Sequence, residues 1–273
     1  MAVSETNRLG AHVRNLDSPV LVAVFYLASI GLLLLGAIRS AYEYTDPRFV
    51  VDYFGTELQV AVLLLFATIA FFPAARIGLR GPELENGPKI IPLAIVFAVA
   101  IAGWIVSRLT VPAEVSIDSA MSLRILRTTL FVGVTEEWMY RGLLFVSLSR
   151  WLGLRRGAYS SLLLFGALHL LNIAAGVAAP AAIIQFFMSM LAGGTFLLAA
   201  VGTRSLVVPI VAHGFYDFFV IDAGRFHAAG AISWTAVVVL GVNLIVGIFC
   251  MIRIARLEGK EPFSFGELQR RIC

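Results

Sequence analysis

Eight long apolar segments, joined by short polar connections, run through this sequence. The segments are residues 19–38, 58–77, 90–107, 119–149, 157–175, 181–202, 206–222 and 233–252. Each comes close to or exceeds the roughly 20 mainly apolar residues that a helix needs to cross a bilayer. A composition that is 59% hydrophobic and 14% charged leaves too few polar side chains to cover a soluble surface. The sequence therefore predicts an all-α, polytopic transmembrane helical bundle of about eight membrane helices.

No internal repeat or low-complexity tract separates the segments, so residues 1–273 are predicted to form a single integral membrane domain. The formal charge of +4 does not indicate a nucleic-acid partner, because the basic residues are scattered singly between apolar segments. Basic residues do report orientation, since they concentrate in loops on the cytoplasmic side of a membrane. In an eight-helix arrangement most of them fall on the side that holds both termini. Both termini are therefore predicted to be cytoplasmic.

The fourth segment carries the pattern Glu-Glu-x-x-x-Arg at Glu136, Glu137 and Arg141. Charged side chains inside a membrane are costly, and they generally face the interior of a bundle and serve a function. An ion pair between Arg141 and one glutamate would be a purely structural explanation, but it leaves the second glutamate without a partner. The pattern therefore favours a functional site.

Two later segments carry further polar motifs. The fifth contains His169, and the seventh contains His213 and Asp217 one helical turn apart. A lone membrane histidine is often a packing residue, whereas a His and an Asp at this spacing suit metal ligation, a proton relay, or an Asp that orients the His. Asn172 and Asp222 are expected at the outer mouth of a cavity or on the surface.

The three motifs share one depth in the predicted bundle. At 1.5 Å of rise per residue, Glu136, His169 and Asp217 lie about 21, 18 to 20 and 20 Å from the cytoplasmic ends of their helices. His213 lies about 14 Å deep on the same scale. Helices that run in opposite directions would not place their strongly polar residues in one layer unless these residues meet. We therefore predict that the motifs form one site.

The residue types in this layer favour peptide hydrolysis. A glutamate near a histidine can activate a water molecule, and a second histidine can stabilise the developing oxyanion. A nucleophilic side chain is not indicated, because Cys250 has no charged residue beside it and no Gly-x-Ser-x-Gly motif occurs. The sequence also lacks a His-Glu-x-x-His motif.

Taken in order, the motifs Glu-Glu-x-x-x-Arg, Phe-x-x-x-His and His-x-x-x-Asp resemble those of the CPBP family of intramembrane proteases, which includes the type II CAAX prenyl endopeptidases. The resemblance covers roughly residues 120–222, the protease-like core of the chain. It implies that Glu136 is the water-activating base and that His169 assists it. It also implies that Glu137 and Arg141 hold the geometry of that base.

The same resemblance gives oxyanion stabilisation to His213 and to residue 217, where the prenyl-processing members typically have Asn and this sequence has Asp217. A carboxylate donates a hydrogen bond only when it is protonated, so Asp217 either holds a proton or only orients His213. This departure keeps Zn²⁺ open as a cofactor, with Glu136, His169, His213 and Asp217 as a chemically reasonable ligand set. Family members are described both as metalloproteases and as metal-independent glutamic proteases, and we favour the interpretation without a metal or other cofactor.

We therefore predict an intramembrane endopeptidase that acts on a membrane-associated substrate, which the resemblance extends to prenylated CAAX-type proteins. Its expected partners are membrane lipid and a peptide or lipidated protein substrate. Two alternatives have a different function. One is a non-catalytic peptide-binding immunity or scaffold protein of the same family. The other is a proton-coupled transporter, because intramembrane Glu, His and Asp also build proton relays, although no inverted repeat favours it.

Overall fold

The computed structural model describes residues 18–44, 46–72, 77–82, 90–111, 116–226, 234–257 and 265. Over these residues the chain forms helices and no strand, which confirms the predicted all-α class. The helices are α2 (Pro19–Arg39), α3 (Pro47–Asp52), α4 (Phe54–Ala70), α5 (Ile91–Leu109), α6 (Ser119–Glu137), α7 (Phe145–Leu152), α8 (Leu154–Leu168), α9 (Ala179–Thr203), α10 (Val207–Gly224) and α11 (Trp234–Ala255). A π-helix, η2 (Trp138–Leu144), joins α6 to α7, and a 3₁₀-helix, η3 (His169–Ala175), extends α8.

Seven helical segments in the described part of the chain are long and apolar enough to cross a membrane. They are Pro19–Arg39, Pro47–Ala70, Ile91–Leu109, Leu154–Ala175, Ala179–Thr203, Val207–Gly224 and Trp234–Ala255. Seven of the eight predicted segments overlap them, although the second begins well before residue 58. Large apolar side chains such as Ile69, Ile184 and Ile245 are exposed on the outer faces of these helices, as contact with lipid requires. The chain is thus an integral, multi-pass membrane protein.

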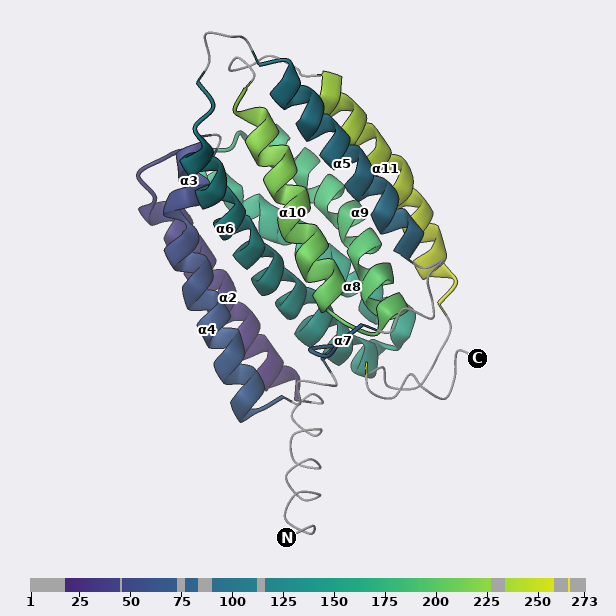
Figure 1. Cartoon of the computed structure of the whole chain (residues 1–273). Helices are drawn as coiled ribbons and strands as arrows, with labels where there is room; N and C mark the ends of the chain where they lie inside the picture. Colours follow the sequence, from purple (N-terminus) through teal and green to yellow (C-terminus); the bar gives the residue numbers. More distant parts are fainter. Residues whose placement is uncertain are drawn as a thin grey trace.

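The remaining predicted segment, 119–149, corresponds to the uninterrupted helical path through α6, η2 and α7. Six charged side chains make this path too polar to count as an apolar span by itself. They are Arg124, Arg127, Glu136, Glu137, Arg141 and Arg150. Figure 1 shows α6 in the middle of the bundle, between α4 and α10. The described residues therefore pass through the bundle eight times, and seven of these passes are apolar along their length.

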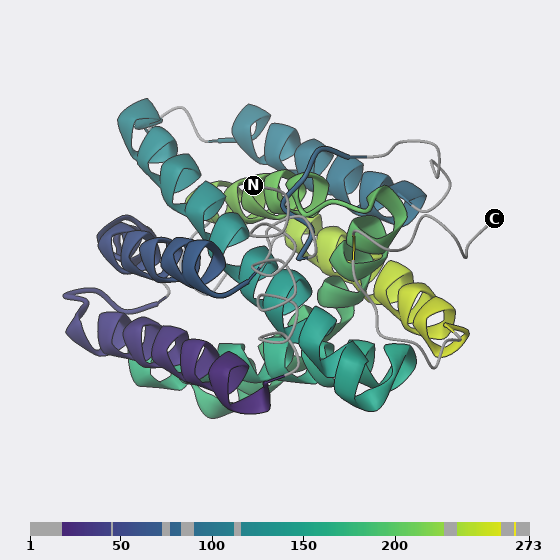
Figure 2. The ribbon, with the colours of Figure 1, turned by 90° about the horizontal axis from the view of Figure 1, so that it is seen from below.

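Successive passes alternate in direction, so α2 begins and α11 ends at the same end of the bundle (Figure 1). Seen along the bundle from that end, α2 and α4 form one side and α5 and α11 form the other (Figure 2). The first turns of α2 and α6 are fixed by side-chain caps, because Ser18 and Asp118 accept hydrogen bonds from the backbone N–H groups of Leu21 and Met121.

Helices α6 and α10 cross closely in the interior, where two glycines face each other. A Cβ atom on Gly133 would lie 2.5 Å from the carbonyl oxygen of Ile210, and one on Gly214 would lie 2.7 Å from the Cα of Leu130. Small residues of this kind allow membrane helices to approach backbone to backbone. The crossing brings the polar motif of α6 next to the polar motif of α10.

The orientation in the membrane is a prediction that labelling can test. Arg48 lies exposed at one end of the bundle and Arg155 lies exposed at the other. We expect a membrane-impermeant maleimide, added to intact cells, to label Arg48→Cys and to label Arg155→Cys only after permeabilisation. The experiment uses a Cys273→Ser background, in which buried Cys250 is the remaining cysteine. The reverse pattern would show that the termini are not cytoplasmic.

Candidate active site

A cavity of about 300 Å³ lies inside the bundle, between α6 and α10 on one side and η3 and α9 on the other. Its wall is mainly apolar, and it is completed by side chains from α2, α3, α4 and α11. Four of the six predicted site residues line it, namely Glu136, His169, His213 and Asp217. None of the described lining residues is a lysine or an arginine. The three polar motifs, which are far apart in the sequence, thus meet in one apolar cavity.

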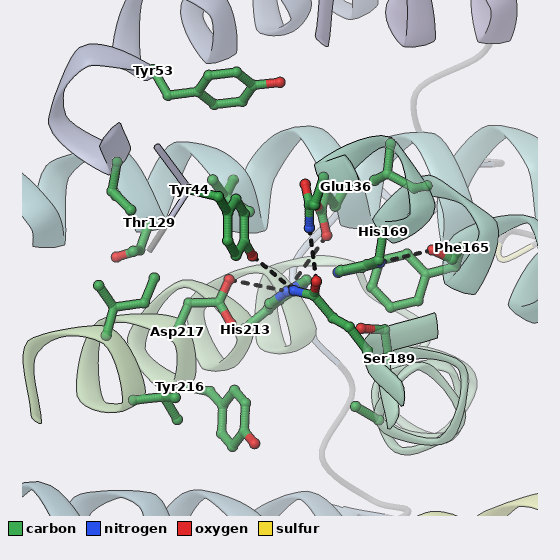
Figure 3. Close-up of a pocket in the computed structure, with 18 of the residues that line it drawn as sticks. Tyr44, Tyr53, Thr129, Glu136, Phe165, His169, Ser189, His213, Tyr216 and Asp217 are labelled. Atoms are coloured by element: carbon green, nitrogen blue, oxygen red, sulfur yellow. Dashed lines mark hydrogen bonds and ion pairs between the residues drawn. The ribbon is translucent and has the colours of Figure 1, made fainter. Parts of the chain in front are cut away.

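The Glu136, His213 and Asp217 side chains converge on one point of this cavity (Figure 3). Nε2 of His213 lies 3.6 Å from Oε2 of Glu136 and 3.5 Å from Oδ2 of Asp217. Oε2 of Glu136 accepts no hydrogen bond from the residues that the structure describes. A carboxylate oxygen without a donor, next to an imidazole, is suitably placed to accept a proton from a bound molecule.

Glu137 lies behind this point and is fully buried. Its Oε1 accepts a hydrogen bond from Nδ1 of His213 at 2.8 Å and also pairs with Nη1 of Arg141 at 3.1 Å. We assign the proton of this bond to Nδ1, since a carboxylate can only accept. The resemblance implies that Glu137 and Arg141 hold the base Glu136, whereas the structure shows them holding His213. Nε2 of His213 is the ring nitrogen that faces the cavity.

The guanidinium of Arg141 is fully buried and packs against aromatic rings as well as against Glu137. Its central carbon lies 4.1 Å from the centre of the Phe165 ring. This arrangement uses the weak hydration and planar shape of arginine, which tolerates burial against aromatic faces. Gly193 of α9 makes room for it, because a Cβ atom there would lie 2.8 Å from Nη2 of Arg141 and 2.9 Å from Phe165.

His169 marks the change from α8 to η3, and its ring is oriented by the backbone. Nδ1 of His169 lies 3.1 Å from the carbonyl oxygen of Phe165. A carbonyl oxygen accepts only, so Nδ1 carries the proton and Nε2 has a free lone pair. Figure 3 shows the ring beside Glu136. His169 is therefore placed as a hydrogen-bond acceptor for a molecule held between it and Glu136.

The π-helix η2 begins directly after the two glutamates, and all seven of its residues are buried. A π-helical turn inserts an extra residue into an α-helix and is frequently found at functional sites. Here it follows closely on Glu136, which lines the cavity, and it includes the buried Arg141. No pattern in the sequence indicates it, because each of its residues is also compatible with an ordinary helix.

Two polar residues of the cavity wall, Glu57 and Tyr44, are not predicted from the sequence. Glu57 of α4 is 2% exposed and accepts a hydrogen bond of 2.5 Å from the hydroxyl of Thr135. Because the predicted second segment begins at residue 58, Glu57 falls just outside it. Tyr44 lies in the short connection between α2 and α3, where no periodic pattern identifies a site residue.

Asn172 and Asp222 are both expected at the outer mouth of the cavity or on the surface, but the structure places them in different environments. Asn172 lines the cavity, and its side chain donates a hydrogen bond to Gln185 of α9. Asp222 is fully buried away from the cavity, where it pairs with Arg108 at 2.5 Å and with Arg225 at 2.8 Å. The expectation that Asp222 lines the mouth of the cavity or the surface is therefore wrong. It ties the ends of α5 and α10 together.

The residues that would hold Zn²⁺, if the site uses a metal, are Glu136, His169, His213 and Asp217. In the described part of the chain, no group of three or more His, Cys, Asp or Glu residues is arranged to hold a metal ion. Nδ1 of His213 is already bonded to Glu137, which leaves only its Nε2 for any ligand. The side chains as placed do not fit a metal site, so we derive no chemical step through a metal.

The sequence was compared with known proteins. Residues 118–219 match the model of a family described as type II CAAX prenyl endopeptidase Rce1-like. This match confirms the family predicted from the three motifs, and the matched segment contains all six predicted site residues. Neither a curated protein nor a solved structure matches the chain.

Gly193 and its neighbour Gly194 provide a paired test of the Arg141 site. We expect Gly193→Ala to displace Arg141 and to destabilise the protein by about 1–3 kcal/mol from overpacking alone. Loss of the Glu137 pair would raise this cost to roughly 3–5 kcal/mol. Gly194→Ala is the control, because its Cβ would meet neighbours at 3.4 to 3.6 Å, which is ordinary contact. Thermal unfolding in detergent measures both, and equal melting temperatures would contradict this account.

Proposed function

Residues 118–219 belong to the Rce1-like family of type II CAAX prenyl endopeptidases, and on this premise we propose that the protein is an intramembrane endopeptidase. It hydrolyses a peptide bond of a membrane-associated substrate with a water molecule activated by Glu136 and His169. The observation that carries the proposal is Oε2 of Glu136, which accepts no hydrogen bond from the described residues and lies in an apolar cavity beside the imidazoles of His169 and His213.

In the proposed reaction, a water molecule lies between Glu136 and Nε2 of His169. Glu136 accepts one proton from the water while the water oxygen forms a bond to the carbonyl carbon of the substrate. The resulting tetrahedral intermediate has a negatively charged oxygen. The C–N bond then breaks, and the proton held by Glu136 passes to the departing amine. General acid–base assistance of this kind contributes about 10²–10⁴-fold to a rate.

His213 supports the same reaction from the opposite side of the cavity. Its hydrogen bond to Glu137 fixes the ring, and the negative charge of Glu137 stabilises a protonated imidazole. Nε2 of His213 is then a donor near the place where charge develops. Asp217 lies 3.5 Å from that nitrogen and accepts rather than donates when ionised, so we assign it to orienting His213.

The substrate class follows from the position and lining of the cavity. A mostly apolar cavity enclosed by membrane helices admits polypeptides that are already held at the membrane by their own apolar segments or by a lipid. A prenylated CAAX-type protein is one such substrate, because the matched family is described as type II CAAX prenyl endopeptidase Rce1-like. The absence of lysine and arginine among the described lining residues favours a peptide that presents no anionic group next to the cleaved bond.

Substitution of the base tests the proposal directly. We expect Glu136→Gln and His169→Ala to lower the cleavage rate of a membrane-anchored peptide by at least about 10²-fold. Glu43→Gln is the matched control, because Glu43 is an exposed carboxylate outside the cavity. Initial rates in proteoliposomes measure the effect, and unchanged melting temperatures show that the variants fold. Full activity of Glu136→Gln would overturn the assignment and would support a non-catalytic role or another mechanism.

The metal-independent form of the mechanism has its own test. We expect purified active protein to contain much less than one equivalent of Zn²⁺ and to retain its cleavage rate after prolonged treatment with a chelator. Elemental analysis and the same initial-rate assay give the two readings. Stoichiometric Zn²⁺, together with activity that is lost on chelation and restored by Zn²⁺ alone, would replace this form with a metalloprotease mechanism.

A further inference from the structure

Tyr44, which lies in the connection between α2 and α3, is part of the cavity wall. The backbone N–H of Tyr44 donates a hydrogen bond of 2.9 Å to the carbonyl oxygen of Ala175, at the end of η3. This bond attaches the connection to the element that begins with His169. Figure 3 shows the Tyr44 ring on the same side of the cavity as Glu136, with its hydroxyl pointing toward the centre.

The proposed reaction needs hydrogen-bond donors for the oxyanion, and the motif residues supply few of them. Nδ1 of His169 is used by the Phe165 carbonyl, and Nδ1 of His213 is used by Glu137. Nε2 of His213 lies between two carboxylates, and Asp217 can only accept when it is ionised. A neutral hydroxyl in the cavity would therefore supply what the motif residues lack.

The hydrogen bonds around Tyr44 leave its proton free. Nδ2 of Asn172 donates to Oε1 of Gln185 at 2.9 Å, and Nε2 of Gln185 donates to the Tyr44 hydroxyl oxygen at 2.7 Å. We assign the Gln185 amide in this direction, in which its oxygen accepts from Asn172 and its nitrogen donates to Tyr44. The Tyr44 hydroxyl oxygen then accepts a hydrogen bond from Gln185 in the cavity wall, and the O–H group can donate a hydrogen bond into the cavity.

Tyr44 also stays protonated under ordinary conditions. Burial, with a smaller effect of the nearby Asp217 and Glu136 carboxylates, raises the pKa of Tyr44 to about 12, against the lowering effect of the Gln185 hydrogen bond. Tyr44 is a donor at neutral pH for this reason. A second cavity tyrosine, Tyr53, differs in one respect, since its hydroxyl donates a hydrogen bond of 2.6 Å to the carbonyl oxygen of Leu33.

We propose that Tyr44 is a catalytic residue whose hydroxyl donates a hydrogen bond to the oxyanion of the tetrahedral intermediate. The inference rests on the proposed function, and it places a catalytic group outside the segment 118–219 that matches the family. Gln185 is a positioning residue that acts through Tyr44. The reaction then has donors on two walls, with His213 from α10 and Tyr44 from the connection before α3.

The first experiment compares Tyr44 with Tyr53, two of the three tyrosines that line the cavity. We expect Tyr44→Phe to lower kcat by about 10²–10³-fold with little change in KM, which is the effect of removing one oxyanion donor. Tyr53→Phe removes a hydroxyl that is bonded to the backbone and should keep kcat within about twofold. Gln185→Leu leaves the Tyr44 hydroxyl in place without its orienting partner, and it should lower kcat by a smaller factor than Tyr44→Phe.

The second experiment measures binding and needs no turnover. A membrane-soluble phosphinic peptide presents a tetrahedral, anionic centre, and its parent peptide amide presents none. We expect Tyr44→Phe to weaken binding of the phosphinic peptide at least tenfold, while binding of the amide is unchanged. Gln185→Leu should also weaken binding of the phosphinic peptide and leave binding of the amide unchanged. It tests the proposal if Tyr44→Phe does not fold.

The outcomes separate the two proposals. If Glu136→Gln is inactive but Tyr44→Phe keeps the wild-type kcat and phosphinic-peptide affinity, the role of Tyr44 is overturned and the proposed function stands. If both tyrosine variants lose kcat equally, the effect of Tyr44→Phe is structural and the inference fails. If Glu136→Gln cleaves as well as the wild type, the proposed function itself fails.

Discussion

The buried pairing of Glu137 with both Arg141 and His213 is the interaction on which the rest of the site depends. Oε1 of Glu137 pairs with Arg141 at 3.1 Å and accepts a hydrogen bond from His213 at 2.8 Å. Neither Glu137 nor Arg141 lines the cavity. In a membrane interior, removal of one partner would leave a buried charge uncompensated, at a cost of about 3–5 kcal/mol. The imidazole that faces Glu136 and Asp217 is therefore anchored by charges that a substrate does not reach.

Close helix packing makes this pairing geometrically feasible. Gly133 and Gly214 let the backbones of α6 and α10 meet, so that Glu137, one turn after Gly133, and His213, directly before Gly214, come within bonding distance. Gly193 makes the space that the guanidinium of Arg141 fills. The same positions that stabilise a membrane bundle by close approach thus set the distances between polar groups. The glycines that allow close helix packing therefore also set the geometry of the polar site.

The sequence predicts the bundle and the meeting of the three polar motifs, because apolar segments of membrane length and charges inside them are both unusual patterns. It does not predict Tyr44, since a tyrosine in a short connection belongs to no periodic pattern. The burial of Asp222 is also missed, because its partner Arg108 comes from α5, 114 positions away, and the pair forms only in the folded bundle. Residues whose role depends on tertiary contacts across distant segments lie beyond what spacing alone can indicate.

Hydrolysis that depends on Glu136 is the central claim, and the peptide termini generated in cells test it most directly. Mass spectrometry of new N- and C-termini in membrane fractions can compare cells that produce the wild-type protein with cells that produce equal amounts of Glu136→Gln. The account predicts a set of termini from membrane-associated proteins that appears with the wild type and is absent with the variant. Identical sets of termini in the two samples, with both proteins folded and in the membrane, would contradict it.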